Sequence, residues 1–293
     1  MTAHFFTVDV EEHFQVSAFD RTVSRDDWPN LSGRLHHTVP LILERLDRVD
    51  AKGTFFVLGW VARHRADVVR AIARAGHEIA SHGYWHHRVN TRSPEHFRED
   101  VRASKAEIED VTGAKVQGYR APSFSIVPGC EWAFDILLEE GFIYDSSIFP
   151  VRRSGYGYAG APRIPHLIKR QAGTLHEFPL ATTQVAGVTI PAAGGGYLRH
   201  FPERIIHRAF AEASRQGVCA TFYLHPWEVD PGQPRMPVGL LTRLRHYRGL
   251  DRALDRVERL LDAFPFTSIG SFLRDKDSPA IGAEYQSPAS ALS

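Results

Sequence analysis

The sequence predicts an α/β fold with a largely parallel sheet, either open or closed as a barrel, and three observations support this prediction. Segments with helical periodicity alternate with short apolar segments along most of the 293 residues, which is typical of parallel sheets. Hydrophobic residues make up 43% and charged residues 24% of the chain, as in ordinary soluble globular proteins. Polar residues suited to catalysis follow several predicted strands, and βα barrels build their active sites from the C-terminal ends of strands.

The alternation is clearest in the first half of the chain. Short apolar runs predict strands at residues 4–10, 54–58, 77–80, 116–119 and 142–144. Apolar residues at helical spacing predict helices at residues 39–49, 61–75, 93–111 and 132–140. Gly76, Gly113 and Gly141 follow three of these helices, and glycine is favoured at helix C-termini.

The second half is less regular, because residues 150–200 are rich in glycine, proline and arginine. Strands are predicted at residues 175–178, 185–190, 218–224 and 266–269, and helices at residues 202–216 and 250–263. Residues 276–293 are small and polar, so we expect a flexible tail there.

Composition and charge exclude several classes of protein. The net charge is +1, without a long basic or acidic block, so nothing favours binding to nucleic acid or to an anionic membrane. No apolar stretch reaches the ~20 residues of a membrane span. No signal peptide is visible; we expect a cytoplasmic protein, with export by another route left open. Cys130 and Cys219 stand apart in apolar surroundings, so we expect buried thiols rather than a disulfide or a thiolate metal site.

Two carboxylates end the first predicted strand. Asp9 and Glu11 are two residues apart, so in an extended chain they share one face while Val10 points to the other. One carboxylate can then bind a metal while the other acts as a base. The alternative is a solvated acidic loop, because Glu12 follows directly.

Two histidines follow the third predicted strand. His82 and His86 are four residues apart, a spacing that aligns side chains on a helical turn and is used by helical zinc sites. Zinc hydrolases use three protein ligands and leave one position open. The alternative is a pair of surface or core histidines, since the chain contains 16. His87 is expected to point elsewhere.

Two further residues stand at predicted strand ends. Arg120 can pair with a catalytic carboxylate and keep it ionised, or it can simply cap strand ends. His225 can act as a general acid toward a leaving amine, or it can be a hydrogen-bonded core residue. The glycines at residues 194–196 permit close backbone approach to a ligand, but they lack the context of a phosphate-binding loop, so nucleotide binding is rejected.

Taken in order, four motifs resemble those of NodB-type polysaccharide deacetylases (carbohydrate esterase family 4). They are Thr7-Val-Asp9-Val-Glu11, Ser81-His82-Gly-Tyr-Trp-His86, Arg120-Ala-Pro122 and Leu224-His225. The resemblance covers roughly residues 4–225. The stretch from Gly194 to Tyr197, followed by Phe201-Pro202, is similar to a subfamily from exopolysaccharide loci with exosortase systems, whose C-terminal extension here runs over about 190–275.

This resemblance implies a distorted (β/α)7 barrel in a single NodB-like domain over residues 1–275. It implies one divalent metal, most often zinc, although nitrogen and oxygen ligands also accept cobalt, nickel or iron. By matching positions, Asp9 is the general base, His82 and His86 are metal ligands, Arg120 orients the base and His225 is the general acid. Val10 stands where the family's second aspartate usually lies, so Glu11 is expected to be the third ligand.

The implied substrate is an N-acetylated polysaccharide or oligosaccharide. Tyr119 and Pro122 are expected beside it, with a backbone N–H of residues 119–123 stabilising the oxyanion. The family's usual fourth motif, which contains a tryptophan, is absent from its expected place; Trp227 or the loop at residues 183–200 can replace it. Candidates for the wall of a sugar-binding groove are Trp85, Tyr197, Arg199 and Trp227.

Three hypotheses follow. The first is N-deacetylation of amino sugars in an exopolysaccharide or its lipid-linked precursor. The second keeps the fold but changes the substrate, giving a small-molecule amidase or a cyclic-imide hydrolase. The third is a catalytically inactive carbohydrate-binding domain, which the complete set of acid, base and ligands disfavours.

Overall fold

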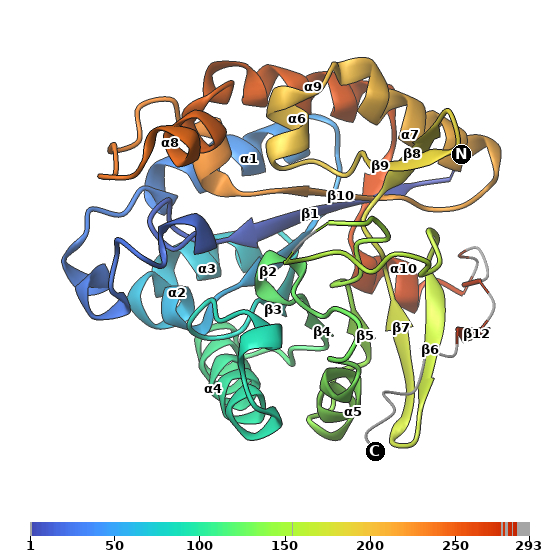
Figure 1. Cartoon of the computed structure of the whole chain (residues 1–293), viewed down its shortest axis with the longest axis horizontal. Helices are drawn as coiled ribbons and strands as arrows, with labels where there is room; N and C mark the ends of the chain where they lie inside the picture. The colour runs from blue at the N-terminus through green and yellow to red at the C-terminus, as the bar shows by residue number, and fades with distance from the viewer. Residues whose placement is uncertain (1, 154, 277, 279–280, 283, 286–293) are drawn as a thin grey trace.

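A row of parallel strands forms the centre of the computed structural model, which describes residues 2–153, 155–276, 278, 281–282 and 284–285. The row runs in the order β10 (Thr221–Leu224), β1 (His4–Val10), β2 (Thr54–Val57), β3 (Glu78–Ser81), β4 (Gly118–Tyr119), β5 (Tyr144–Asp145) and β7 (Gly173–Glu177). A parallel bridge joins Leu180, just after β7, to Thr221 on β10. The bridge brings the two edges of the row together, so the strands have the arrangement of a distorted barrel, and the predicted α/β fold is confirmed (Figure 1).

Helices connect the strands and cover them, because neighbouring parallel strands need a crossover connection. The larger ones are α1 (Leu35–Arg48), α3 (Ala66–Arg74), α4 (Pro94–Thr112), α5 (Trp132–Glu139), α7 (Glu203–Arg215) and α9 (Ala253–Ala263). Each buries one apolar stripe; on α3 it consists of Val68, Val69 and Ile72. On α4, the Ser93 side chain caps the first turn and Gly113, in a left-handed conformation, ends the last.

The remaining elements are short. The helices are α2 (Gly59–His64), α6 (Gly196–His200), α8 (Leu240–Tyr247) and α10 (Ile269–Arg274). The strands are β6 (His166–Arg170), β8 (Thr182–Val185), β9 (Val188–Pro191), β11 (Phe266–Thr267) and β12 (Glu284–Tyr285). The 3-10 turns are η1 (Ser17–Phe19), η2 (Arg25–Asn30), η3 (Val89–Thr91), η4 (Pro122–Phe124), η5 (Pro226–Val229) and η6 (Leu250–Arg252).

Several element boundaries differ from the prediction. The single helix expected at residues 61–75 is divided into α2 and α3, because Arg65 leaves the helical conformation (φ −138°). The strand expected at residues 185–190 is a hairpin, β8 and β9, with a turn between its strands. The last strand stops at Thr267, where Ser268 caps a helix that was not predicted. Within the predicted tail, β12 pairs with β6; the rest lies largely outside the described residues.

The core lies inside the barrel and beneath the helices. Cys130 and Cys219 are buried free thiols, as predicted. Among the helices of the described residues, none combines the length and apolar character needed to cross a membrane.

His4, the first residue of β1, is a fully buried histidine. Its Nδ1 accepts a hydrogen bond from the Ala220 amide at 3.2 Å, and its Nε2 lies 2.9 Å from Ser214 Oγ. Burial lowers the pKa of His4 from 6.5 to about 4. Protonation would also remove the Nδ1 acceptor, so the folded protein holds this ring neutral.

We expect His4 to reduce the free energy of unfolding by about 1.4 kcal/mol per pH unit as the pH falls from 6.5 toward 4. In that window the unfolded chain binds a proton at His4 and the folded chain does not. A His4→Gln variant has no such titrating group. The difference by which its free energy of unfolding is smaller than that of the wild type should therefore shrink as the pH falls. Urea denaturation at neutral and mildly acidic pH measures the deficit; a value independent of pH contradicts the prediction.

Candidate active site

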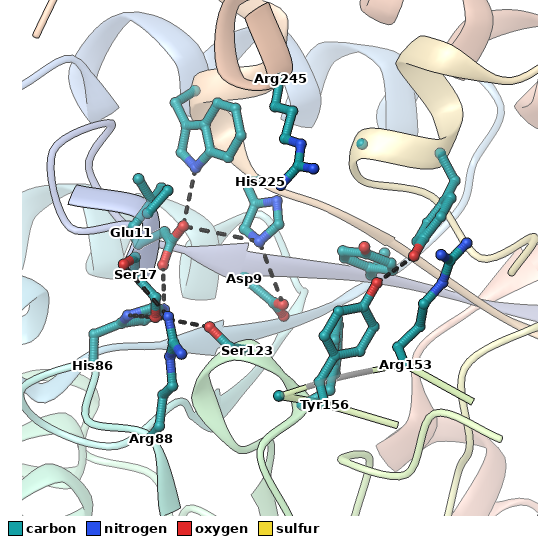
Figure 2. Close-up of a pocket in the computed structure, with 18 of the residues that line it drawn as sticks. Asp9, Glu11, Ser17, His86, Arg88, Ser123, Arg153, Tyr156, His225 and Arg245 are labelled. Atoms are coloured by element: carbon teal, nitrogen blue, oxygen red, sulfur yellow. Dashed lines mark hydrogen bonds and ion pairs between the residues drawn. The ribbon is translucent and has the colours of Figure 1, made fainter. Parts of the chain in front are cut away.

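Polar side chains from distant parts of the chain meet at the C-terminal ends of the strands. Asp9 lies near the end of β1 and Glu11 directly follows the strand, and the segments after β3, β4 and β10 contribute the predicted histidines and arginine. A cavity of about 810 Å³ opens among them, and its lining includes Asp9, Glu11, His86 and His225. Figure 2 shows these side chains pointing toward one another.

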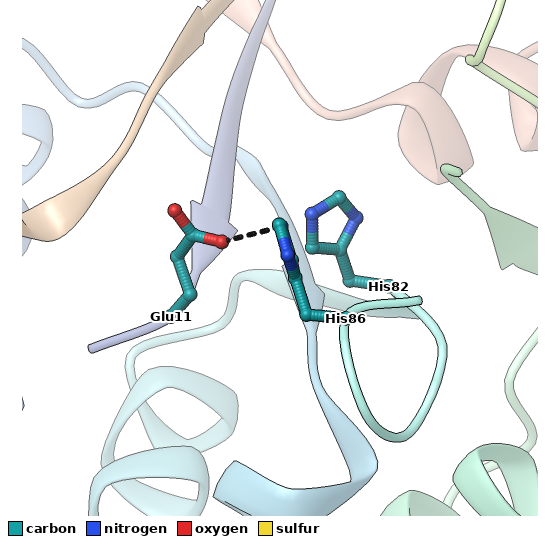
Figure 3. Close-up of side chains that lie close together, drawn as sticks. All are labelled: Glu11, His82 and His86. Carbon is teal, nitrogen blue, oxygen red and sulfur yellow. Dashed lines mark ion pairs between the residues drawn. The ribbon is translucent and has the colours of Figure 1, made fainter. Parts of the chain in front are cut away.

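Glu11, His82 and His86 form a compact set of potential metal ligands (Figure 3). One ligand atom from each lies within 4.8 Å of the others, and all three residues are buried. Glu11 Oε2 is 2.7 Å from His86 Nε2. A buried carboxylate oxygen this close to a nitrogen that can also bind metal fits a shared cation, and these three donors match a zinc site with an open position.

Hydrogen bonds behind the ligands fix their orientation. His82 Nδ1 donates to the Arg120 carbonyl oxygen at 2.9 Å, which leaves Nε2 free as the ligand atom. On the other side, Trp227 Nε1 donates to Glu11 Oε1 at 3.0 Å. Burial alone would raise the pKa of Glu11, but the charge and hydrogen bond of His86, with smaller effects of two other histidines, lower it to about 2.

His82 and His86 converge as predicted, but they belong to a loop and not to a helical turn. The helical spacing that predicted their pairing was therefore the wrong reason. Gly83 (φ 75°) and His86 (φ 55°) both have left-handed backbone conformations. Asp100 on α4 accepts hydrogen bonds from the amides of Tyr84 and Trp85, at 2.8 and 3.3 Å. A Cβ at Gly83 would lie 2.8 Å from Asp100 Oδ2, so glycine is required for this loop. Asp100 was not identified from the sequence because it lies within a helix.

Arg120 holds Asp9 in place inside the barrel. Its Nη1 is 2.7 Å from Asp9 Oδ1 and 2.6 Å from Thr7 Oγ1. Its Nε and Nη2 donate to the carbonyl oxygen and hydroxyl of Ser146, at 3.0 and 2.7 Å. The guanidinium also lies over the Phe56 ring, 4.1 Å from its centroid. With Arg120 fully buried, the Asp9 carboxylate has a fixed position and a compensating cation.

His225 faces both carboxylates. Its Nε2 is 3.9 Å from Asp9 Oδ2 and 3.8 Å from Glu11 Oε1, while its Nδ1 is 3.0 Å from Glu228 Oε2. Burial alone would lower the pKa of His225, but the hydrogen bond to Glu228 and the charges of the three carboxylates raise it to about 9. The ring is therefore protonated at neutral pH and can donate a proton from Nε2.

Glu228 and Arg199 support His225 from behind. Glu228 Oε1 is 2.7 Å from Arg199 Nε, and both side chains are buried. Arg199 was expected on the wall of a sugar-binding groove; it lies instead behind His225 because its guanidinium pairs with Glu228. Sequence reasoning missed Glu228, whose only signal is its position three residues after His225.

The structure brings only some of the predicted substrate-contacting residues to the cavity. Tyr197 and Trp227 line it, whereas Tyr119, Pro122 and Trp85 do not. Tyr119 is buried in the core, and Pro122 is buried at the start of η4. Trp85 packs against another tryptophan on the outside of the loop. Ser123, from the predicted stretch at residues 119–123, also lines it, and lining residues that were not predicted include Arg88, Phe124, Arg153, Tyr156, Phe201, Tyr223 and Arg245.

The fold and site define a class of βα-barrel protein with one potential metal site at its strand ends. Residues 21–127 match the family model described as polysaccharide deacetylase, and residues 146–274 match a domain of unknown function (DUF3473). The first segment is therefore similar to polysaccharide deacetylases, in agreement with the resemblance seen in the sequence, and the second segment includes nearly all of the expected C-terminal extension. His82, His86 and Arg120 lie in the first matched segment and His225 in the second.

Known proteins resemble the chain to different extents. A peptidoglycan deacetylase of Helicobacter pylori is 31% identical over 113 residues, 38% of this chain and 36% of the relative. A peptidoglycan-N-acetylglucosamine deacetylase of Bacillus cereus is 28% identical over 109 residues, 37% of this chain and 38% of the relative. The chain thus matches only a little over a third of these relatives' length. A candidate polysaccharide deacetylase of Mycobacterium smegmatis has a similar fold, with a TM-score of 0.60, 20% identity and coverage of 92% of this chain and 89% of that one.

Proposed function

We propose that the protein is a metal-dependent hydrolase that removes N-acetyl groups from amino sugars of an exopolysaccharide or of its precursor. The observation that carries this proposal is that Asp9, Glu11, His86 and His225 line one cavity, with a ligand atom of His82 within 4.8 Å of those of Glu11 and His86. Amide hydrolysis needs a base for water, an acid for the departing amine and stabilisation of the oxyanion.

Each of these roles has a candidate residue. A divalent cation held by Glu11, His82 and His86, most often zinc for such ligands, would supply Lewis acidity toward water and the amide carbonyl. Asp9 Oδ2, the oxygen that faces His225, takes the proton of the attacking water. His225 Nε2 gives a proton to the sugar amine as the C–N bond breaks and acetate leaves. Arg120 holds Asp9 in place throughout.

The backbone after β4 offers a further contribution. The amides of Arg120 and Ala121 already donate, to the Ser81 carbonyl oxygen and to Ser147 Oγ. Within the predicted stretch at residues 119–123, Ser123 is the residue that lines the cavity, and we assign the oxyanion-stabilising N–H to it.

The shape of the cavity favours a sugar substrate. Tyr156 and Tyr197 line it, and aromatic faces pack against the CH surfaces of sugar rings. Trp227 also lines the cavity, but its ring is stacked on His225 and His246. Its volume of about 810 Å³ is near the upper end of ordinary small-ligand pockets. We therefore place several sugar units of an oligosaccharide in it.

Acetate release from N-acetylglucosamine oligomers, measured after reconstitution with zinc, tests this function. We expect turnover by the wild type, and loss of both bound metal and turnover in a Glu11→Gln variant. Turnover of a cyclic imide without turnover of the oligomers would favour the small-molecule amidase. Oligomer binding without acetate release from the metal-loaded protein would favour an inactive carbohydrate-binding domain.

A further inference from the structure

Negative and positive side chains occupy different parts of the cavity wall. Asp9 and Glu11 are the only acidic residues among the described lining residues, and both belong to the catalytic set. The rest of the wall carries three arginines, Arg88, Arg153 and Arg245, from three separate parts of the chain. The whole chain has a net charge of only +1, so this cationic wall is a local feature.

The three arginines surround the cavity. Figure 2 shows Arg88 on the side of His86, Arg245 beside His225, and Arg153 next to Tyr156 on the far side of Asp9. The Arg153 side chain also interacts with the Tyr197 hydroxyl. Arg153 and Arg245 therefore lie next to the catalytic groups rather than among them, where a neighbouring sugar unit of a bound chain would lie.

In the described part of the chain, none of the three guanidinium groups forms a salt bridge. Arg88 Nε is buried without a hydrogen-bond partner, and its Nη2 is 3.5 Å from the Ser17 carbonyl oxygen. Leaving a buried donor unsatisfied costs free energy. A neutral acetylated sugar gains little from three cations, whereas arginine binds carboxylates and phosphates through paired hydrogen bonds.

We infer that the substrate is anionic: Arg153 and Arg245 bind a carboxylate or phosphate group carried by the sugar chain next to the acetylated unit. This inference rests on the proposed function and names its substrate class. Cations around a cavity with aromatic walls concentrate the electrostatic field there and attract such a chain. Both arginines belong to the segment that matches the domain of unknown function, which gives that segment a role in substrate selection.

Three probes test the inference. The first is a neutral N-acetylglucosamine oligomer, and the second is an oligomer of equal length that alternates N-acetylglucosamine with glucuronic acid. The third, UDP-N-acetylglucosamine, carries phosphate instead of carboxylate and separates the two sources of charge. We expect kcat/KM for acetate release to be higher for an anionic probe than for the neutral oligomer. The ratio of these two kcat/KM values should fall roughly tenfold in an Arg153→Gln/Arg245→Gln variant, mainly because KM for the anionic probe rises.

One control variant, matched in charge, separates the effect of the cavity arginines from that of general surface charge. Arg152 and Arg243 are exposed neighbours that do not line the cavity, so an Arg152→Gln/Arg243→Gln variant should keep the wild-type ratio. An equal ratio in the wild type and the Arg153→Gln/Arg245→Gln variant would overturn the inference while the proposed function stands. If no probe releases acetate, titration calorimetry with the anionic oligomer decides: weaker binding to the cavity variant supports the inference, and equal binding overturns it.

Discussion

Replacing Asp9 by asparagine is expected to lower kcat for acetate release by roughly 10²- to 10⁴-fold, the usual contribution of a general base. Asparagine has nearly the same shape but cannot accept the proton of the attacking water. The three potential metal ligands are unchanged, so the variant should still bind metal.

The measurement pairs steady-state kinetics with elemental analysis of the same preparation. A variant that binds metal, remains folded and loses turnover supports the assignment of Asp9 as the base. Unchanged turnover would refute it. Because Arg120 loses its anionic partner, the variant's thermal stability must be measured too, and kinetics compared well below its melting temperature.

Replacing Arg120 by methionine is expected to reduce the free energy of unfolding by roughly 3–5 kcal/mol, the range for breaking a buried ion pair at one partner. The Asp9 carboxylate would remain buried without its cation, and the hydroxyls of Thr7 and Ser146 would each lose a donor. Urea denaturation of the metal-free protein measures this loss without a contribution from metal binding.

The double variant Asp9→Asn/Arg120→Met is the matched control. It removes both charges, so it should be more stable than Arg120→Met alone, even though it carries one more substitution. If the double variant is less stable than the wild type by the sum of the losses in the two single variants, the two residues are not coupled as the 2.7 Å contact indicates.

Much of the candidate site was predictable. Its residues stand at the ends of parallel strands, so they could be predicted without knowing the conformations of the loops. Period-two spacing placed Asp9 and Glu11 on one face of β1, and both point into the cavity. His82 and His86 were paired for a helical reason, yet a loop held by Asp100 brings them together. Their position after β3 was therefore a better guide than their spacing.

The supporting residues were not predictable in the same way. Glu228 and Arg199 act through contacts between segments 29 residues apart, and such contacts leave no local pattern. Trp85 was expected in a groove because tryptophan suits sugars, but it packs against Trp28 instead. Strand β6, which forms a hairpin with β7, was not predicted. The glycine- and proline-rich segment before it obscures the strand periodicity.

Anomalous diffraction at the zinc absorption edge, from crystals of the zinc-loaded protein, tests the central claim most directly. We predict one peak about 2.0–2.2 Å from a carboxylate oxygen of Glu11 and from Nε2 of both His82 and His86, with Asp9 and His225 facing it across the cavity. A peak at another place, or none at these three residues in protein that has been given zinc, would contradict the account.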